Sequence, residues 1–122
     1  MLNRVILIGR LTRDPELRQS TSGIPVCNFT LAVNRSYSNA AGERVTDFID
    51  IIAWRQLAEN CGKYLTKGRL IAIEGRLQVR TYETQEGQKR KVLEVIAESV
   101  KFLERSPHSG ADRDDVETFE IS

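Results

Sequence analysis

The stretch VTDFIDIIAWRQLAENCGKYLTKG, residues 45–68, decides the fold because its hydrophobic period changes partway along it. Over residues 45–54 apolar and polar side chains alternate, as in a half-buried β-strand. Over residues 55–67 the apolar side chains instead recur at helical spacing, and Gly68 stands where a helix C-cap is common. The stretch therefore predicts a strand followed at once by one short amphipathic helix.

Further strands are predicted on both sides of this stretch. Period-two alternation or short apolar runs, bounded by turn residues, predict strands over 3–12, 24–36, 69–82 and 89–103. Five short antiparallel strands with a single helix between the third and the fourth describe the OB-fold, a small barrel whose sheet face and loops bind oligonucleotides and sugars. The expected fold class is thus all-β with one helix, a five-stranded antiparallel OB-fold barrel.

Charge divides the chain into a basic body and an acidic end. Residues 1–105 hold 17 Lys and Arg against 12 Asp and Glu, whereas residues 106–122 hold one Arg against five acids. The end also has too few apolar residues to offset the entropy of ordering it. We therefore expect an OB-fold domain over 1–105 and a disordered acidic tail over 106–122. A basic body suits a polyanion, although an ordinary solvated surface explains the charge equally well.

Several classes of protein are excluded by what the sequence lacks. No apolar run approaches the length of a membrane span, and no secretion signal is recognisable, so a cytoplasmic location is expected. Cys27 and Cys61 are isolated and are predicted to be small core residues. His108 is the one histidine and falls in the tail, and no nucleotide-binding or hydrolase motif occurs. We expect no enzyme, no metal and no cofactor.

The strand over residues 45–54 carries the strongest binding signal. If Ile49, Ile51 and Ala53 point into the barrel, Phe48 and Trp54 stand outside it, where unstacked bases could lie on their rings. The alternative is that Phe48 and Trp54 fill the core. Tyr37 and Tyr82 lie beside predicted hairpins, where a tyrosine serves packing as often as binding.

Basic residues lie next to these rings along the chain, as phosphate contacts between stacking platforms should. Arg35 precedes Tyr37, Arg55 follows Trp54, and Arg80 precedes Tyr82. The candidate nucleic-acid contacts are Tyr37, Phe48, Trp54, Tyr82, Arg35, Arg55, Lys67 and Arg80.

The first predicted strand is apolar on both faces. Its consecutive residues Val5, Ile6, Leu7 and Ile8 can fill the barrel with one face, and the other face then needs cover. A second copy of the chain could supply that cover, as could the protein's own helix or loops. We favour an oligomer interface at these four residues.

The stretches NRVILIGRLTRDPELR, FTLAVNRSY, AENCGKYLTKG and IEGRLQVRTYETQEGQ resemble the bacterial single-stranded DNA-binding proteins, over residues 2 to about 103. The resemblance implies a homotetramer of OB-folds, cytoplasmic and associated with the nucleoid, that protects single-stranded DNA in replication, recombination and repair. It places the family's stacking aromatics on Tyr37, Phe48, Trp54 and Tyr82. It also implies that the first strand takes part in the subunit interface.

Two features depart from the family pattern. Asp50 stands where several family members carry a basic residue. Family tails end in an acidic segment with a terminal Pro-Phe that docks on replication and repair proteins, but this tail continues through Ile121 and Ser122. The candidate partner-binding residues of the tail are Asp114, Asp115 and Phe119.

The function predicted is capture of single-stranded DNA without strong sequence preference, by stacking and phosphate contacts. The alternative is an OB-fold interaction module that binds protein or RNA, with the aromatic residues in its core or in an interface.

Overall fold

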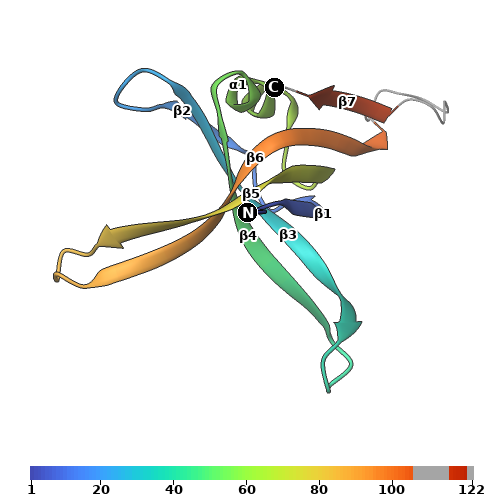
Figure 1. Ribbon diagram of the computed structural model, residues 1–122. Helices are drawn as coiled ribbons and strands as arrows, with labels where there is room; N and C mark the ends of the chain where they lie inside the picture. Colours follow the sequence, from blue (N-terminus) through green and yellow to red (C-terminus); the bar gives the residue numbers. More distant parts are fainter. Residues whose placement is uncertain (106–115, 121–122) are drawn as a thin grey trace.

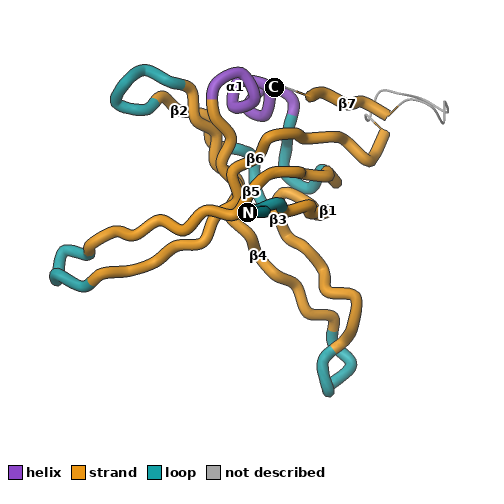
Figure 2. Tube along the Cα trace, viewed as in Figure 1, coloured by secondary structure: helices purple, strands orange, loops and turns teal. Residues whose placement is uncertain are grey.

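The computed structural model describes residues 1–105 and 116–120, which form a closed barrel with two long hairpin arms (Figure 1). The chain runs through β1 (Val5–Leu11), β2 (Glu16–Gln19), β3 (Pro25–Ser38), β4 (Arg44–Trp54), α1 (Arg55–Tyr64), β5 (Leu70–Glu83), β6 (Lys89–Arg105) and β7 (Val116–Glu120). Figure 2 shows how much of this chain is strand, with α1 as the one helix of the described residues. The predicted mostly-β architecture with one helix is confirmed.

The barrel closes through the order β1-β5-β6-β4-β3, and β3 returns to pair with β1. Most neighbours are antiparallel, but β4 and β6 run parallel where Ile51 meets Val95 and Ile52 meets Ile96. The sequence pattern does not reveal this pairing, because period-two alternation is the same in either direction. The helix α1 follows β4 directly, which is the predicted position between the third and fourth barrel strands.

Two glycines allow the barrel strands to approach closely. A Cβ at Gly9 of β1 would collide with the backbone carbonyl of Ala32 on β3. A Cβ at Gly75 would collide with the carbonyl of Ile96, next to the register shift between β5 and β6. Only glycine fits at such crossings, so both positions serve closure of the barrel.

The core is built from the inward faces of the strands and capped by the helix. The largest fully buried side chains are those of Phe29, Phe102, Leu31, Ile51, Ile71, Ile73, Val95 and Val100. Each such side chain contributes roughly 1.5–3 kcal/mol through its removal from water. Leu57, Ala58 and Cys61 give α1 its buried face.

Both cysteines are free and buried, as predicted. Burial raises the pKa of the Cys27 thiol to about 11, and burial also raises the pKa of Cys61. Because the thiolate is the reactive species, these side chains act as small core residues.

Two strands lie where no strand was predicted. The turn-rich region before residue 24 contains β2, which forms a short antiparallel hairpin with β3. After residue 105, β7 pairs with the outer half of β6, from Ser99 opposite Glu120 to Arg105 opposite Val116. The unpaired backbone groups of an edge strand can bind another strand whatever the hydropathy of that strand. The composition of residues 116–120 therefore did not indicate a strand. Residues 106–115 and 121–122 lie outside the described part, and the predicted disorder of the tail stays a prediction.

Candidate functional site

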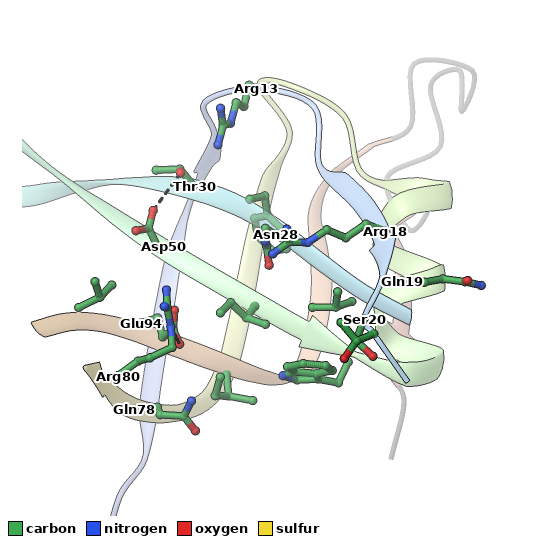
Figure 3. A pocket seen from close by; sticks show the side chains of 17 residues that line it. Arg13, Arg18, Gln19, Ser20, Asn28, Thr30, Asp50, Gln78, Arg80 and Glu94 are labelled. Carbon is green, nitrogen blue, oxygen red and sulfur yellow. Dashed lines mark hydrogen bonds and ion pairs between the residues drawn. The ribbon is translucent and has the colours of Figure 1, made fainter. Parts of the chain in front are cut away.

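The outward face of the β3–β4 sheet forms the floor of a groove. Directly opposite residues of an antiparallel pair share a face, which places Asn28 beside Ile52, Thr30 beside Asp50 and Val26 beside Trp54. The Thr30 hydroxyl donates to Asp50 Oδ1 over 3.1 Å, linking the two strands across the floor. Strands β5 and β6 and the β2 region complete a hollow of about 630 Å³ (Figure 3).

The aromatic side chains of β4 point away from the core. Phe48 is 69% exposed and Trp54 is 42% exposed, while Ile51 and Ala53 of the opposite face are fully buried. The predicted orientation of this strand is therefore confirmed, and the alternative with both rings in the core is wrong. Their role in binding stays a prediction.

The four predicted aromatics do not all lie in the groove. Trp54 lines it, whereas Phe48 and Tyr82 lie on the β3–β4 and β5–β6 strand pairs beyond its lining. Tyr82 is 44% exposed, and the Arg80 guanidinium carbon lies 6.0 Å from the centre of its ring. Tyr37 belongs to β3, but its side chain lies outside the described part.

Two arginines that the sequence analysis missed line the groove. Arg13 and Arg18 enter it from the region of β2, on the side away from Gln78 and Arg80 (Figure 3). Among the described residues neither arginine has a hydrogen bond or ion pair. Arg18 lies on the β2–β3 hairpin and Arg13 in the connection that precedes it, and the turn residues of this region gave no sign of the hairpin.

Two of the predicted basic residues already have acidic partners. Arg35 Nε donates to Asp47 Oδ2 over 3.0 Å and its Nη2 donates to Oδ1 over 3.0 Å, and these bonds hold the pKa of Asp47 below its usual range. Arg80 Nε donates to Glu94 Oε1 over 3.3 Å, and Glu94 is the one buried charged residue of the described barrel. Both guanidinium charges are thus partly compensated within the protein.

The remaining predicted basic residues lie outside the groove. Arg55 is the first residue of α1 and lines a second hollow, which shares Trp54 with the groove. Lys67 lies between α1 and β5, where its backbone N–H donates to Asp14 Oδ1 over 2.8 Å, and it lines neither hollow.

The four residues predicted for an oligomer interface divide between two environments. Val5 and Leu7 pack against the core, whereas Ile6 is 66% exposed and Ile8 is 54% exposed. Leu77, Val79 and Leu93 on the β5–β6 arm are also exposed, which the sequence analysis did not predict. Asp114 and Asp115 of the tail lie outside the described residues, as does the side chain of Phe119, whose backbone belongs to β7.

The described groove has the features of a binding surface. Within residues 1–105 and 116–120 no three His, Cys, Asp or Glu side chains gather as metal ligands would. No described helix is long and apolar enough to cross a membrane. A groove with an exposed indole and uncompensated guanidinium groups fits an extended ligand that carries flat rings and negative charges.

Comparison with known proteins gives a consistent result. The model of the Single-strand binding protein family matches residues 2–103. The Single-stranded DNA-binding protein of Staphylococcus aureus (strain N315) is 62% identical over 104 residues, which are 85% of this chain and 67% of that protein. Single-stranded DNA-binding protein A of Bacillus subtilis (strain 168) is 55% identical over 111 residues, 91% of this chain and 64% of that protein. The matched region thus spans about two thirds of the length of these curated relatives.

Proposed function

Since this chain belongs to the single-strand binding protein family, we propose that it binds single-stranded DNA without strong sequence preference and protects it during replication, recombination and repair. The binding uses stacking and phosphate contacts, and no bond in the DNA is made or broken.

The outward face of β4 carries this proposal. Phe48 and Trp54 project from the same face of one strand, and the groove beside Trp54 contains two uncompensated arginines, Arg13 and Arg18. Stacking of a base on an aromatic side chain contributes roughly 1–3 kcal/mol, whatever the base, because every base has a π-face. Such a surface binds an unpaired strand and excludes a duplex, whose base faces are already stacked.

The candidate residues take two roles in this function. Tyr37, Phe48, Trp54 and Tyr82 stack on bases, and Arg35, Arg55, Lys67 and Arg80 contact phosphates. Arg13 and Arg18 join the second group because they line the groove without acidic partners. Arg35 and Arg80 contribute less counterion release than these two, because Asp47 and Glu94 already offset their charges.

Assembly and partners complete the proposal. A second copy of the chain covers the exposed Ile6 and Ile8 of β1, as part of a homotetramer. The acidic tail, with Asp114, Asp115 and Phe119, contacts replication and repair proteins. The place of action is the cytoplasm, at the nucleoid. Sedimentation of the full chain tests the assembly, and a monomer at micromolar concentration would contradict it.

Fluorescence of Trp54 provides the test of binding, because the chain contains one tryptophan. We expect quenching by a long oligothymidine, reversal of the quenching by added salt, and little effect of duplex DNA. Stronger binding of RNA than of DNA, or the absence of nucleic-acid binding in an independent filter assay, would instead support the OB-fold interaction module.

A further inference from the structure

A second hollow lies beside Trp54 and adjoins the groove. Its volume is about 650 Å³, similar to that of the groove. Trp54 and Ile96 line both hollows, so the two are neighbours that share these side chains. The lining consists of Trp54, Arg55, Gln56, Leu57, Arg76, Ile96, Ala97 and Glu98.

The lining has an apolar part and a charged part. Leu57, Ile96 and Ala97 are almost completely buried and form an apolar floor of the hollow. Arg55 and Arg76 are exposed, and neither has a hydrogen bond or ion pair among the described residues. This combination matches a nucleotide, which has a flat ring or sugar to bury and a phosphate to neutralise.

The backbone at Arg55 is in an unusual conformation. Arg55 has φ of 61°, the one positive φ among the described residues that are not glycine. This left-handed region is unfavourable for residues with a Cβ and free of that cost for glycine. The strain falls where β4 turns into α1, directly after Trp54. Strained residues of this kind concentrate at functional sites, where the side chain itself is needed.

We propose that this second hollow is a further nucleotide subsite, in which Arg55 and Arg76 hold a phosphate of the strand that has passed Trp54. The subsite rests on the proposed function and extends it. The DNA path does not end at the groove but continues around the Trp54 ring to the N-terminal end of α1. One nucleotide lies against Leu57, Ile96 and Ala97, and its phosphate lies between the two guanidinium groups.

Glu98 makes the subsite sensitive to charge. Its carboxylate lines the same hollow and forms no ion pair with Arg76, so it repels an incoming phosphate without neutralising the arginine. A Glu98→Gln substitution should therefore tighten binding of the strand. Weaker or unchanged binding by this variant would contradict the placement of a phosphate here.

The test compares the wild-type chain with Arg55→Gly, Arg76→Gln and the double variant, using a long oligothymidine at several salt concentrations. Lys63→Gln is the matched control, because Lys63 is an exposed cation of α1 that lines neither hollow. Each lost phosphate contact should reduce the steepness of the log-log salt dependence by about 0.7 per protomer that contacts the strand. Because Arg55 and Arg76 share one phosphate, the loss of that contact in the double variant corresponds to roughly threefold weaker binding at about 0.2 M salt. The control should show neither change.

Thermal unfolding separates this proposal from a purely structural role of Arg55. Arg55→Gly relieves the positive φ, so its melting temperature should equal or exceed that of the wild type while its binding weakens. Arg55→Lys should keep most of the salt dependence. A double variant that binds with the wild-type salt slope would overturn the subsite and the phosphate contact of Arg55, but it would leave single-stranded DNA binding at the groove intact. Absence of binding by the wild-type chain would instead overturn the proposed function itself.

Discussion

Strand β4 has two faces that share one sequence pattern but have different surroundings. Ile51 and Ala53 point into the barrel and are completely buried, while Phe48 and Trp54 point outward and remain exposed. On the inner face the side chains are selected for volume and for their removal from water. On the outer face the rings of Phe48 and Trp54 keep much of their surface exposed among the described residues. The difference shows that an exposed ring on a regular strand is available for a ligand.

Of the substitutions that distinguish the two faces of β4, Ile51→Ala should change the stability of the protein most. Truncation of this buried side chain should lower the free energy of unfolding by about 2–5 kcal/mol, through lost burial and the cavity left behind. Chemical denaturation measures this loss. The protein that remains folded should still bind oligothymidine. A change below about 1 kcal/mol would show that the inner face is not the close-packed core described here.

Trp54→Ala should give the reverse pattern. Loss of the stacking platform should weaken oligothymidine binding by about 1–3 kcal/mol, while the denaturation midpoint changes little. Competition binding with a labelled strand measures the affinity, because the variant has no tryptophan. Trp54→Phe is the matched control and should retain most of the affinity. If Trp54→Ala lowered stability as much as Ile51→Ala does, the distinction between the two faces would fail.

Asp50→Asn tests whether the groove floor faces phosphates. Asp50 lines the groove, and an asparagine oxygen can still accept the hydrogen bond from the Thr30 hydroxyl. Removal of the carboxylate should tighten binding of single-stranded DNA by about two- to fivefold at low salt, an effect that salt screens. Equal affinities at all salt concentrations would place the phosphates away from this part of β4.

Asp47→Asn should have the smallest effect. Asp47 belongs to the same face of β4 as Ile51 and Ala53, but it lies beyond the core. Hydrogen bonds from Arg35 lower the pKa of its carboxyl group. A carboxyl whose pKa is lowered by folding adds stability above its unfolded pKa and loses that contribution as pH falls through the folded pKa. The small difference in melting temperature between wild type and variant should therefore vanish toward acid pH.

The same variant also affects binding. Asp47→Asn releases Arg35 for phosphate contact, so the salt dependence of binding should steepen by up to about 0.7. An unchanged slope would show that Arg35 serves the β3–β4 arm rather than the DNA.

Much of the barrel could be predicted because its strands and helix follow local periodicity. The alternation over residues 45–54 and the helical spacing after Trp54 correspond closely to β4 and α1, although α1 ends at Tyr64 and not at Lys67. The burial of Cys27 and Cys61 also followed from their apolar neighbours. These features depend on side chains that are close together along the chain.

The candidate site was less predictable because it is assembled from distant segments. Trp54 and Arg80 were expected and do line the groove, but Arg18 reaches it through the β2–β3 hairpin and Arg13 through the connection between β1 and β2. No local pattern indicated that Asp47 and Glu94 would compensate two of the expected cations. Adjacent rings and charges along the chain are therefore an incomplete guide to a surface made from several strands.

By itself, the sequence determined the five barrel strands and the helix, the inward face of β4 and the likeness to one family, because hydrophobic periodicity and local motifs are properties of neighbouring residues. Tertiary structure alone decided the parallel pairing of β4 with β6, the groove lined by Arg13 and Arg18, and the hollow between Arg55 and Arg76. The physical reason is that pairing between strands and closure of the barrel bring together residues far apart in the chain, and the charges that meet there depend on that closure.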